Sequence, residues 1–175
     1  MDWYESVFEL IDMRSFSNLW YWIALAVVWS TASHWVVGVP WDMITRARRR
    51  GGQAEADMMA LLAIYIARAL WIGREAGLVL LGAICFVLTA LGMLGFWYGI
   101  EFAQAVFLIL APMSLVGALS LRTAGRLAPM VARGEPPYRG LIRHRIAVQG
   151  LGMVSIFVTA IWGMWQNMSI GVLGN

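Results

Sequence analysis

The chain contains no lysine, only one cysteine and few charged residues of either sign. The single cysteine, Cys85, allows no internal disulfide and no cysteine-based metal cluster. Charged residues make up only 13% of the 175 residues and hydrophobic residues 61%, a balance that excludes an ordinary soluble surface. The net charge of +3 is small, so the composition indicates no nucleic-acid partner. We therefore expect an integral membrane protein.

Sequence motifs of catalysis are missing as well. The chain has no glycine-rich phosphate-binding loop, no HExxH metal motif and no pair of acidic residues within an apolar segment. No polar stretch is long enough to form a soluble domain that would host an active site. The sequence therefore predicts a protein that is not an enzyme, with no catalytic residues and no metal site.

Four apolar segments are long enough to cross a membrane. A helix rises about 1.5 Å per residue, so roughly 20 apolar residues cover a hydrocarbon core of about 30 Å. We expect an all-α fold, a single transmembrane domain over residues 1–175 built as a four-helix bundle. The expected spans cover residues of about 18–39, 77–98, 101–121 and 146–165. The Pro- and Gly-containing stretch 123–145 is expected to be an irregular, solvated connection.

Arginine bias gives the orientation, because short arginine-rich loops resist translocation. All arginines but Arg14 fall on one side of the predicted spans: Arg46, Arg48, Arg49, Arg50, Arg68, Arg74, Arg122, Arg126, Arg133, Arg139, Arg143 and Arg145. This side is predicted to be cytoplasmic, and both termini periplasmic, in the cytoplasmic or intracytoplasmic inner membrane of a bacterium. Interfacial tryptophans predict the same topology, with Trp20 and Trp22 in the outer belt and Trp35 and Trp41 in the inner one.

Two further helices are expected to lie at the membrane surface. Residues 2–13 place apolar and acidic side chains on different faces, which is typical of a helix on the outer surface. Residues 53–73 contain an apolar stretch that Arg68 interrupts and that is short for a span. We expect an interfacial helix there, and whether residues 58–72 are embedded stays open.

Small residues recur at intervals that favour close helix packing. Gly95 and Gly99 form one such pair, and Ser155, Thr159 and Gly163 repeat the same spacing in the last span. The partner of each face is either another span of this chain or another subunit.

His34 is the candidate cofactor ligand, because a neutral imidazole within a span can bind haem iron or a chlorophyll magnesium. The alternative is a histidine near the interface that is hydrogen-bonded to a neighbour. The following run of Arg46, Arg48, Arg49 and Arg50 is expected to bind anionic lipid headgroups or the acidic face of a partner at the cytoplasmic surface.

The segment from Asp2 to Met43 reads DWYESVFELIDMRSFSNLWYWIALAVVWSTASHWVVGVPWDM. It resembles a family of small multi-span alphaproteobacterial membrane proteins, and the resemblance continues more weakly through the arginine run and GGQAEAD. Members of that family are sometimes named as components of the Suf complex for iron–sulfur assembly, a role requiring cysteine or nucleotide chemistry that these residues do not supply. The expected architecture is also similar to that of four-span accessory subunits of photosynthetic reaction-centre and light-harvesting complexes.

The leading hypothesis is a non-catalytic accessory or assembly subunit of a larger bioenergetic membrane complex, with photosynthetic complexes as the case that the second resemblance implies. Such a subunit supplies packing surface and contacts to lipid, or to bacteriochlorophyll or carotenoid held by partner subunits. One alternative is a small oligomeric transporter or channel component, which intramembrane charge would support. Another is a haem- or chlorophyll-binding protein that uses His34.

Overall fold

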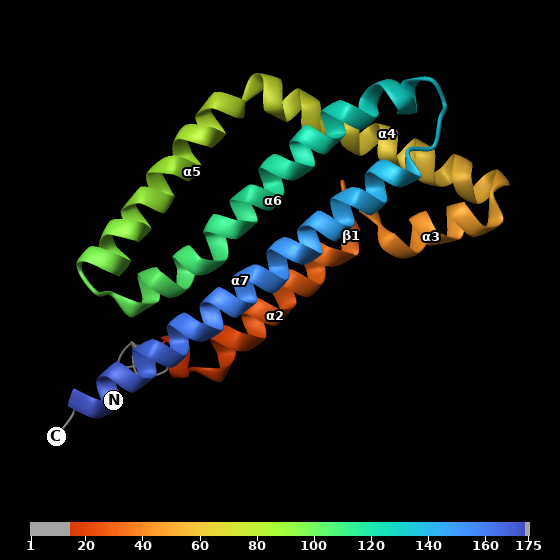
Figure 1. The fold of residues 1–175 in the computed structure, drawn as a ribbon. Helices are drawn as coiled ribbons and strands as arrows, with labels where there is room; N and C mark the ends of the chain where they lie inside the picture. The colour runs from red at the N-terminus through yellow and green to blue at the C-terminus, as the bar shows by residue number, and fades with distance from the viewer. Residues whose placement is uncertain (1–14, 174–175) are drawn as a thin grey trace, which may run out of the picture.

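The structure, a computed structural model, describes residues 15–173 and is almost entirely helical (Figure 1). The helix expected over residues 2–13 lies outside the described residues. The elements in chain order are η1 (Ser15–Ser17), α2 (Leu19–His34), β1 (Trp35–Val36), β2 (Val39–Pro40), α3 (Trp41–Arg50), α4 (Gly52–Glu75), α5 (Gly77–Gly92), the π-helix η2 (Met93–Trp97), α6 (Glu101–Ala132) and α7 (Tyr138–Leu173).

Within the described residues, four helices are long and apolar enough to cross a membrane, namely α4, α5 continued by η2, α6 and α7. The last three contain the second to fourth predicted spans. The first predicted span contains the 16-residue helix α2, which at 1.5 Å per residue is only about 24 Å long. In Figure 1, α2, α5, α6 and α7 share one direction, whereas α4 crosses them at one end of the molecule. The chain is a helical bundle that fits a multi-pass membrane protein.

The helix of the first predicted span ends at His34 instead of continuing to Val39. A β-hairpin follows, in which Trp35 pairs with Pro40 and Val36 with Val39. Its turn residues Val37 and Gly38 both have positive φ, at 50° and 83°, as expected for the turn type that matches the twist of paired strands. Pro40 disfavours helix at the preceding residue, which explains why the apolar pattern does not continue as a helix.

The expected irregular connection over 123–145 is wrong in its extent. Helix α6 continues to Ala132 and α7 begins at Tyr138, so only the stretch 133–137 is irregular. Gly134, at φ 73°, ends α6 with two backbone hydrogen bonds, Gly134 to Val131 and Glu135 to Met130. This is the Schellman arrangement of a helix C-terminus. The two prolines just before Tyr138 suit a helix N-terminus, where the missing N–H removes no helical hydrogen bond.

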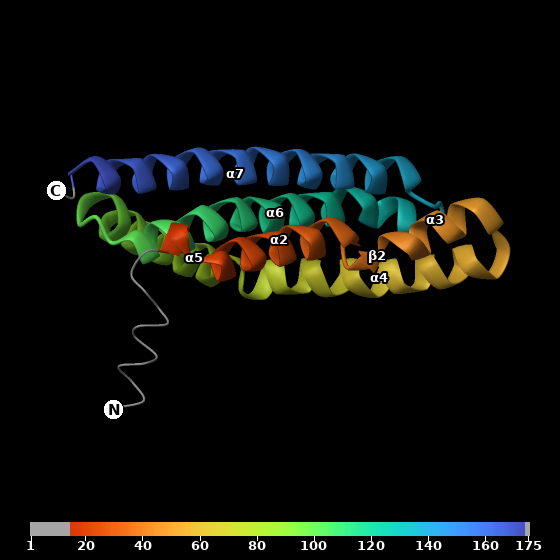
Figure 2. The same ribbon diagram turned by 90° about the horizontal axis from the view of Figure 1, so that it is seen from below.

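A buried apolar cluster occupies the end of the bundle that α4 crosses. We call this end the cap, comprising residues 35–75 and 122–145, in which the hairpin, α3 and α4 pack against the C-terminal part of α6 and the N-terminal part of α7 (Figures 1 and 2). Its buried residues are Val36, Val37, Val39, Ile44, Ala47, Met58, Leu62, Ile66, Ala124, Leu127 and Leu141. The shared core fixes α6 and α7 relative to α4, and thereby builds the site described below.

Polar side chains join the helices at the opposite end of the bundle. Gln104 is buried on α6; its Nε2 donates to Gly95 O (2.8 Å), and its Oε1 accepts from Trp162 Nε1 (2.9 Å) and Gln166 Nε2 (2.7 Å). Ser17 Oγ donates to Asn167 Oδ1 at 2.8 Å. This last bond brings the two ends of the described chain to the same end of the bundle.

Candidate functional site

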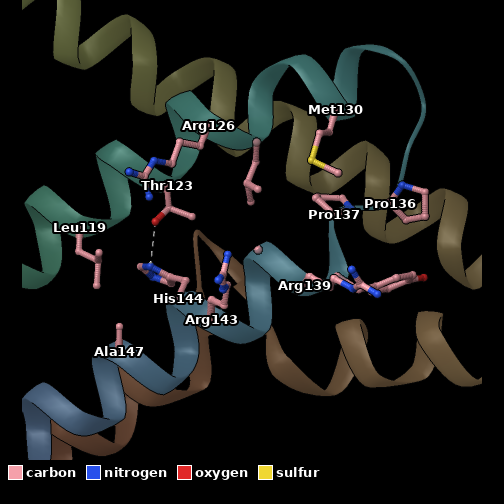
Figure 3. Close-up of a pocket in the computed structure, with 13 residues that line it drawn as sticks. Leu119, Thr123, Arg126, Met130, Pro136, Pro137, Arg139, Arg143, His144 and Ala147 are labelled. Atoms are coloured by element: carbon pink, nitrogen blue, oxygen red, sulfur yellow. Dashed lines mark hydrogen bonds between the residues drawn. The ribbon is translucent and has the colours of Figure 1, made fainter.

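A cleft of about 880 Å³ lies in the cap between α6 and α7 (Figure 3). Its walls combine apolar side chains with three arginines, a histidine, a threonine and a tyrosine. The lining residues are Leu119, Thr123, Arg126, Leu127, Met130, Pro136, Pro137, Tyr138, Arg139, Gly140, Arg143, His144 and Ala147.

Helical periodicity explains which side chains face the cleft. Positions 119, 123, 126, 127 and 130 recur at intervals of three and four residues and therefore share one face of α6. Positions 140, 143, 144 and 147 do the same on α7. At Gly140 the helices approach closely, because a β-carbon there would lie 2.5 Å from Leu127 Cδ2. The cleft is thus a gap between two helices that touch at Gly140.

The charge of the cleft is positive. Arg126, Arg139 and Arg143 are exposed, and no residue of the lining is acidic. Among the described residues, the ion pairs are His34–Asp42, Arg46–Asp42 and Arg133–Glu135, so none of the three cleft arginines is neutralised by one. The cleft therefore presents unpaired guanidinium groups beside apolar walls.

His144 closes the cleft at the contact between the helices and is 3% exposed. Figure 3 shows it meeting Thr123 across the gap, with Nδ1 at 3.3 Å from Thr123 Oγ1; its Nε2 lies 3.4 Å from Ser120 Oγ. Ser120 Oγ donates its proton to Val116 O, so the arrangement assigns the hydrogen to Nε2 and lets Nδ1 accept from Thr123. Burial lowers the pKa of His144, because desolvation disfavours the imidazolium.

Acidification is expected to destabilise the protein through His144. The folded-state pKa is below the usual value near 6.5, so the unfolded chain binds the proton more readily, and stability falls as the pH drops through about 6.5. We expect a lower melting midpoint at pH 5.5 than at pH 7.5, and a smaller difference in His144→Gln. An unchanged difference in His144→Gln would contradict this assignment.

Tyr138, at the start of α7, joins the cleft to α4. Its hydroxyl donates to Glu55 Oε2 at 2.6 Å. Desolvation first, and then the hydrogen bond and negative charge of Glu55, raise the pKa of Tyr138 to about 12. Tyr138 therefore stays neutral at physiological pH, and its bond to Glu55 holds the N-terminal end of α7 against α4.

His34 lies at the end of α2, outside this cleft. Its side chain is 52% exposed, and its Nε2 lies 3.7 Å from Asp42 Oδ1. It lines a separate pocket of about 400 Å³ with Ser30, Thr31, Ser33, Trp35 and Arg145. His34 and His144 thus line different pockets. Haem or pigment ligation by His34 stays a prediction.

The predicted interfacial tryptophans fall into two groups. Trp20 and Trp35 are exposed. Trp22 is instead held by a hydrogen bond from its Nε1 to Phe16 O (3.0 Å), and Trp41 packs on the cap core with the guanidinium of Arg145 3.9 Å from its ring centre. The second pair therefore contributes to packing within the chain.

The predicted arginine run is exposed along α3, next to the α3–α4 connection. Arg46 pairs with Asp42 at 3.5 Å, an exposed pair of small energetic value. Arg48, Arg49 and Arg50 form the last turn of α3, where positive charge suits the helix dipole. Figure 1 shows this turn at the tip of a helical hairpin that extends from the bundle.

Most of the predicted small-residue positions pack within the chain. Gly95 contacts Gln104, Ser155 Oγ donates to Leu108 O (3.5 Å), Thr159 is fully buried and Gly163 faces Phe16. Gly99 has no side-chain neighbour and instead takes the positive φ of 72° in the turn before α6. At Gly95, Ser155 and Gly163 the close neighbour is thus another segment of this chain.

The sequence alone does not indicate the cleft, because it predicts a loop over residues 123–145, in which Arg126, Arg139 and Arg143 only orient the chain. Their spacing from Thr123 and His144 becomes informative once both segments are helical. Within residues 15–168, no group of histidine, cysteine and acidic side chains is placed to hold a metal ion. Comparison of the chain with protein-family models, curated protein sequences and solved structures finds no match.

Proposed function

We propose that the chain is a non-catalytic accessory or assembly subunit of a larger bioenergetic membrane complex. The observation that carries this proposal is the exposure of α5. No residue of α5 is buried, and its main neighbour in the chain is α6 (Figure 1). Large apolar side chains such as Leu78, Val79 and Phe86 lie open along it. The exposed side of α5 is therefore available for contact with other membrane subunits.

The exposed surface of α5 also has the composition of a helix-packing face. Gly82, Cys85 and Thr89 are exposed, small, and spaced by three and four residues, so they share one side of the helix. No atom of the chain would lie within 4 Å of a β-carbon at Gly82. Small residues allow a second helix to approach closely, which is how helices associate in lipid. This supports a partner helix rather than lipid alone against α5.

The placement in the membrane belongs to the same proposal. We place α2, α5 with η2, α6 and α7 across the bilayer, the cap on the cytoplasmic side, and the end that holds Ser17 and Asn167 on the periplasmic side. The arginines of the described residues lie on elements of the cap, which supports this orientation. The open face of α4 carries Ala60, Ala63, Ile64, Ala67 and Trp71, with Arg68 and Arg74 beside them. That mixture supports an interfacial position for α4.

A pair of glycine substitutions tests the role of α5. In Gly82→Leu, the added side chain blocks close approach of a partner helix, so we expect the co-purified subunits to fall at least fivefold in yield. Gly117→Leu on α6 is the matched control, since its β-carbon also meets no atom within 4 Å, and it should retain them. Neither variant should lower the melting midpoint of the isolated protein. The measurement is quantitative mass spectrometry of affinity-purified material from native membranes in a mild detergent.

The results distinguish a partner helix on α5 from chromophore binding by His34. Equal yields of partner subunits with both variants would contradict a partner helix on α5. Loss of a bound chromophore from the purified material in His34→Ala, with the subunits retained, would instead support the ligand role of His34. Visible absorption of the wild-type particle, together with the identity of its subunits, would show whether the complex is photosynthetic.

A further inference from the structure

The cleft between α6 and α7 combines two properties that one ligand class satisfies. Arg126, Arg139 and Arg143 surround it with positive charge that no ion pair of the described residues neutralises. Leu119, Leu127, Met130, Pro136, Pro137 and Ala147 make much of its wall apolar. An inorganic anion would contact the arginines but would leave the apolar wall exposed to water. An amphiphile with a phosphate headgroup would contact the arginines with its phosphate and the apolar wall with its hydrocarbon part.

The depth of the cleft fits a lipid in a bilayer. Leu119 and Ala147 lie beside the predicted membrane boundaries at about residues 121 and 146, whereas the three arginines lie farther along the chain from those boundaries, within the cap. Acyl chains that descend past Leu119 and Ala147 would therefore leave the phosphate at the height of the arginines. In Figure 3, Arg143 points into the space between α6 and α7.

The acidic side chains near the cleft already have hydrogen-bond partners other than the cleft arginines. Glu55 accepts the hydrogen bond of Tyr138 at the rim, and Glu135 is bound to Arg133 by two hydrogen bonds of 3.1 and 3.2 Å. Planar guanidinium groups bind phosphate oxygens in bidentate geometry, which favours arginine over lysine at such sites. The charge complementarity thus selects an anionic phosphate from a membrane whose headgroups lie at the same level.

We propose that this cleft binds the headgroup of an anionic glycerophospholipid, with Arg126, Arg139 and Arg143 on the phosphate and the apolar wall against the proximal acyl chains. The site is separate from the exposed arginine run at the tip of α3. The proposal rests on the membrane placement proposed above, but not on α5 or on the partner complex, because every residue of the cleft belongs to this chain.

The test is a native mass-spectrometry titration of the detergent-purified full chain with short-chain phosphatidylglycerol. The triple variant Arg126→Gln, Arg139→Gln, Arg143→Gln is compared with Arg48→Gln, Arg49→Gln, Arg50→Gln, which loses the same charge at the tip of α3. An arginine near anionic headgroups contributes about fivefold in affinity, so we expect roughly a hundredfold weaker binding in the cleft variant. The tip variant should change less than about threefold, because its arginines do not line the cleft.

Any one of four outcomes would overturn the proposal. Equal loss in both triple variants would show that binding follows net charge alone. Inorganic phosphate that binds as tightly as the lipid would identify a soluble anion as the ligand. Phosphatidylcholine of the same chain length that binds equally well would show that the arginines do not select an anionic head. Arg143→Gln alone replaces one exposed side chain; it should weaken binding about fivefold, and unchanged binding in this single variant would also contradict the proposal.

Discussion

Replacing Leu62 with alanine is expected to lower the free energy of unfolding by about 3 kcal/mol, within the usual range of 2–5 kcal/mol for leucine truncation in a packed core. Leu62 is 0% exposed and belongs to the cap core together with Met58 and Ile66 of the same helix. The substitution removes buried methyl groups and leaves a cavity between α4 and its neighbours. These neighbours include α3 and α6, so the whole cap should loosen.

The measurement is the thermal midpoint in mild detergent, followed by tryptophan fluorescence. A loss of this size corresponds to about 10 °C for a chain of this length. Ile64→Ala is the control on the same helix, because Ile64 is 64% exposed, and it should shift the midpoint by less than about 3 °C. Similar shifts for both variants would show that the cap does not hold α4 as described.

Gly38→Ala is expected to cost about 2–4 kcal/mol, from two effects that add at one position. Gly38 has φ +83°, a conformation that a residue with a β-carbon adopts only with strain. The new carbon would also lie 2.5 Å from Tyr65 Cγ and Cδ1 on α4. Tyr65 is held in the cap by its own helix, so either the hairpin or the ring must move.

Gly134→Ala separates the two effects. Its φ of +73° is similar, but no atom lies within 4 Å of the position of its β-carbon. This variant should lose only the backbone contribution, about 1–2 kcal/mol. The difference between the two variants then measures the contact between the hairpin and α4. Equal losses would contradict that contact.

Much of the architecture follows from simple patterns in the sequence. The lengths of the apolar segments predict the helices at residues of about 77–98, 101–121 and 146–165, and α5 with η2, α6 and α7 cover these ranges up to Tyr98, which follows η2. The helix expected over 53–73 is confirmed as α4, which is itself long and apolar enough to span a membrane. Length and composition therefore do not distinguish α4 from a span, and its interfacial position stays a prediction; α4 does cross the direction of the other long helices (Figure 1).

The cap is the part that the sequence does not reveal. Its core is formed by the hairpin after α2 and by segments that lie far apart along the chain. The pattern of apolar residues within any one segment therefore does not predict it. The prolines and Gly134 predict a long loop, but in the structure Gly134 ends α6, and Pro136 and Pro137 directly precede the start of α7. The sequence therefore shows that the cleft arginines are charged residues near a predicted span, but it does not predict that they line one cleft.

The same limit applies to the polar network at the other end. Gln104 is an ordinary polar residue in the sequence, and its three bonds join it to residues 9, 58 and 62 positions away. Long separations of this kind are fixed by helix packing and cannot be read from spacing along one helix. The three hydrogen bonds of Gln104 join η2, α6 and α7.

The most direct test of the proposed role is the size and composition of the particle that contains this chain in a gentle detergent extract of native membranes. The proposal predicts that the 19.5 kDa chain elutes in a particle several times its own mass and together with other membrane polypeptides. Elution of the chain alone, or only with copies of itself, at every detergent concentration would contradict the proposed subunit role and favour an oligomeric transporter or channel.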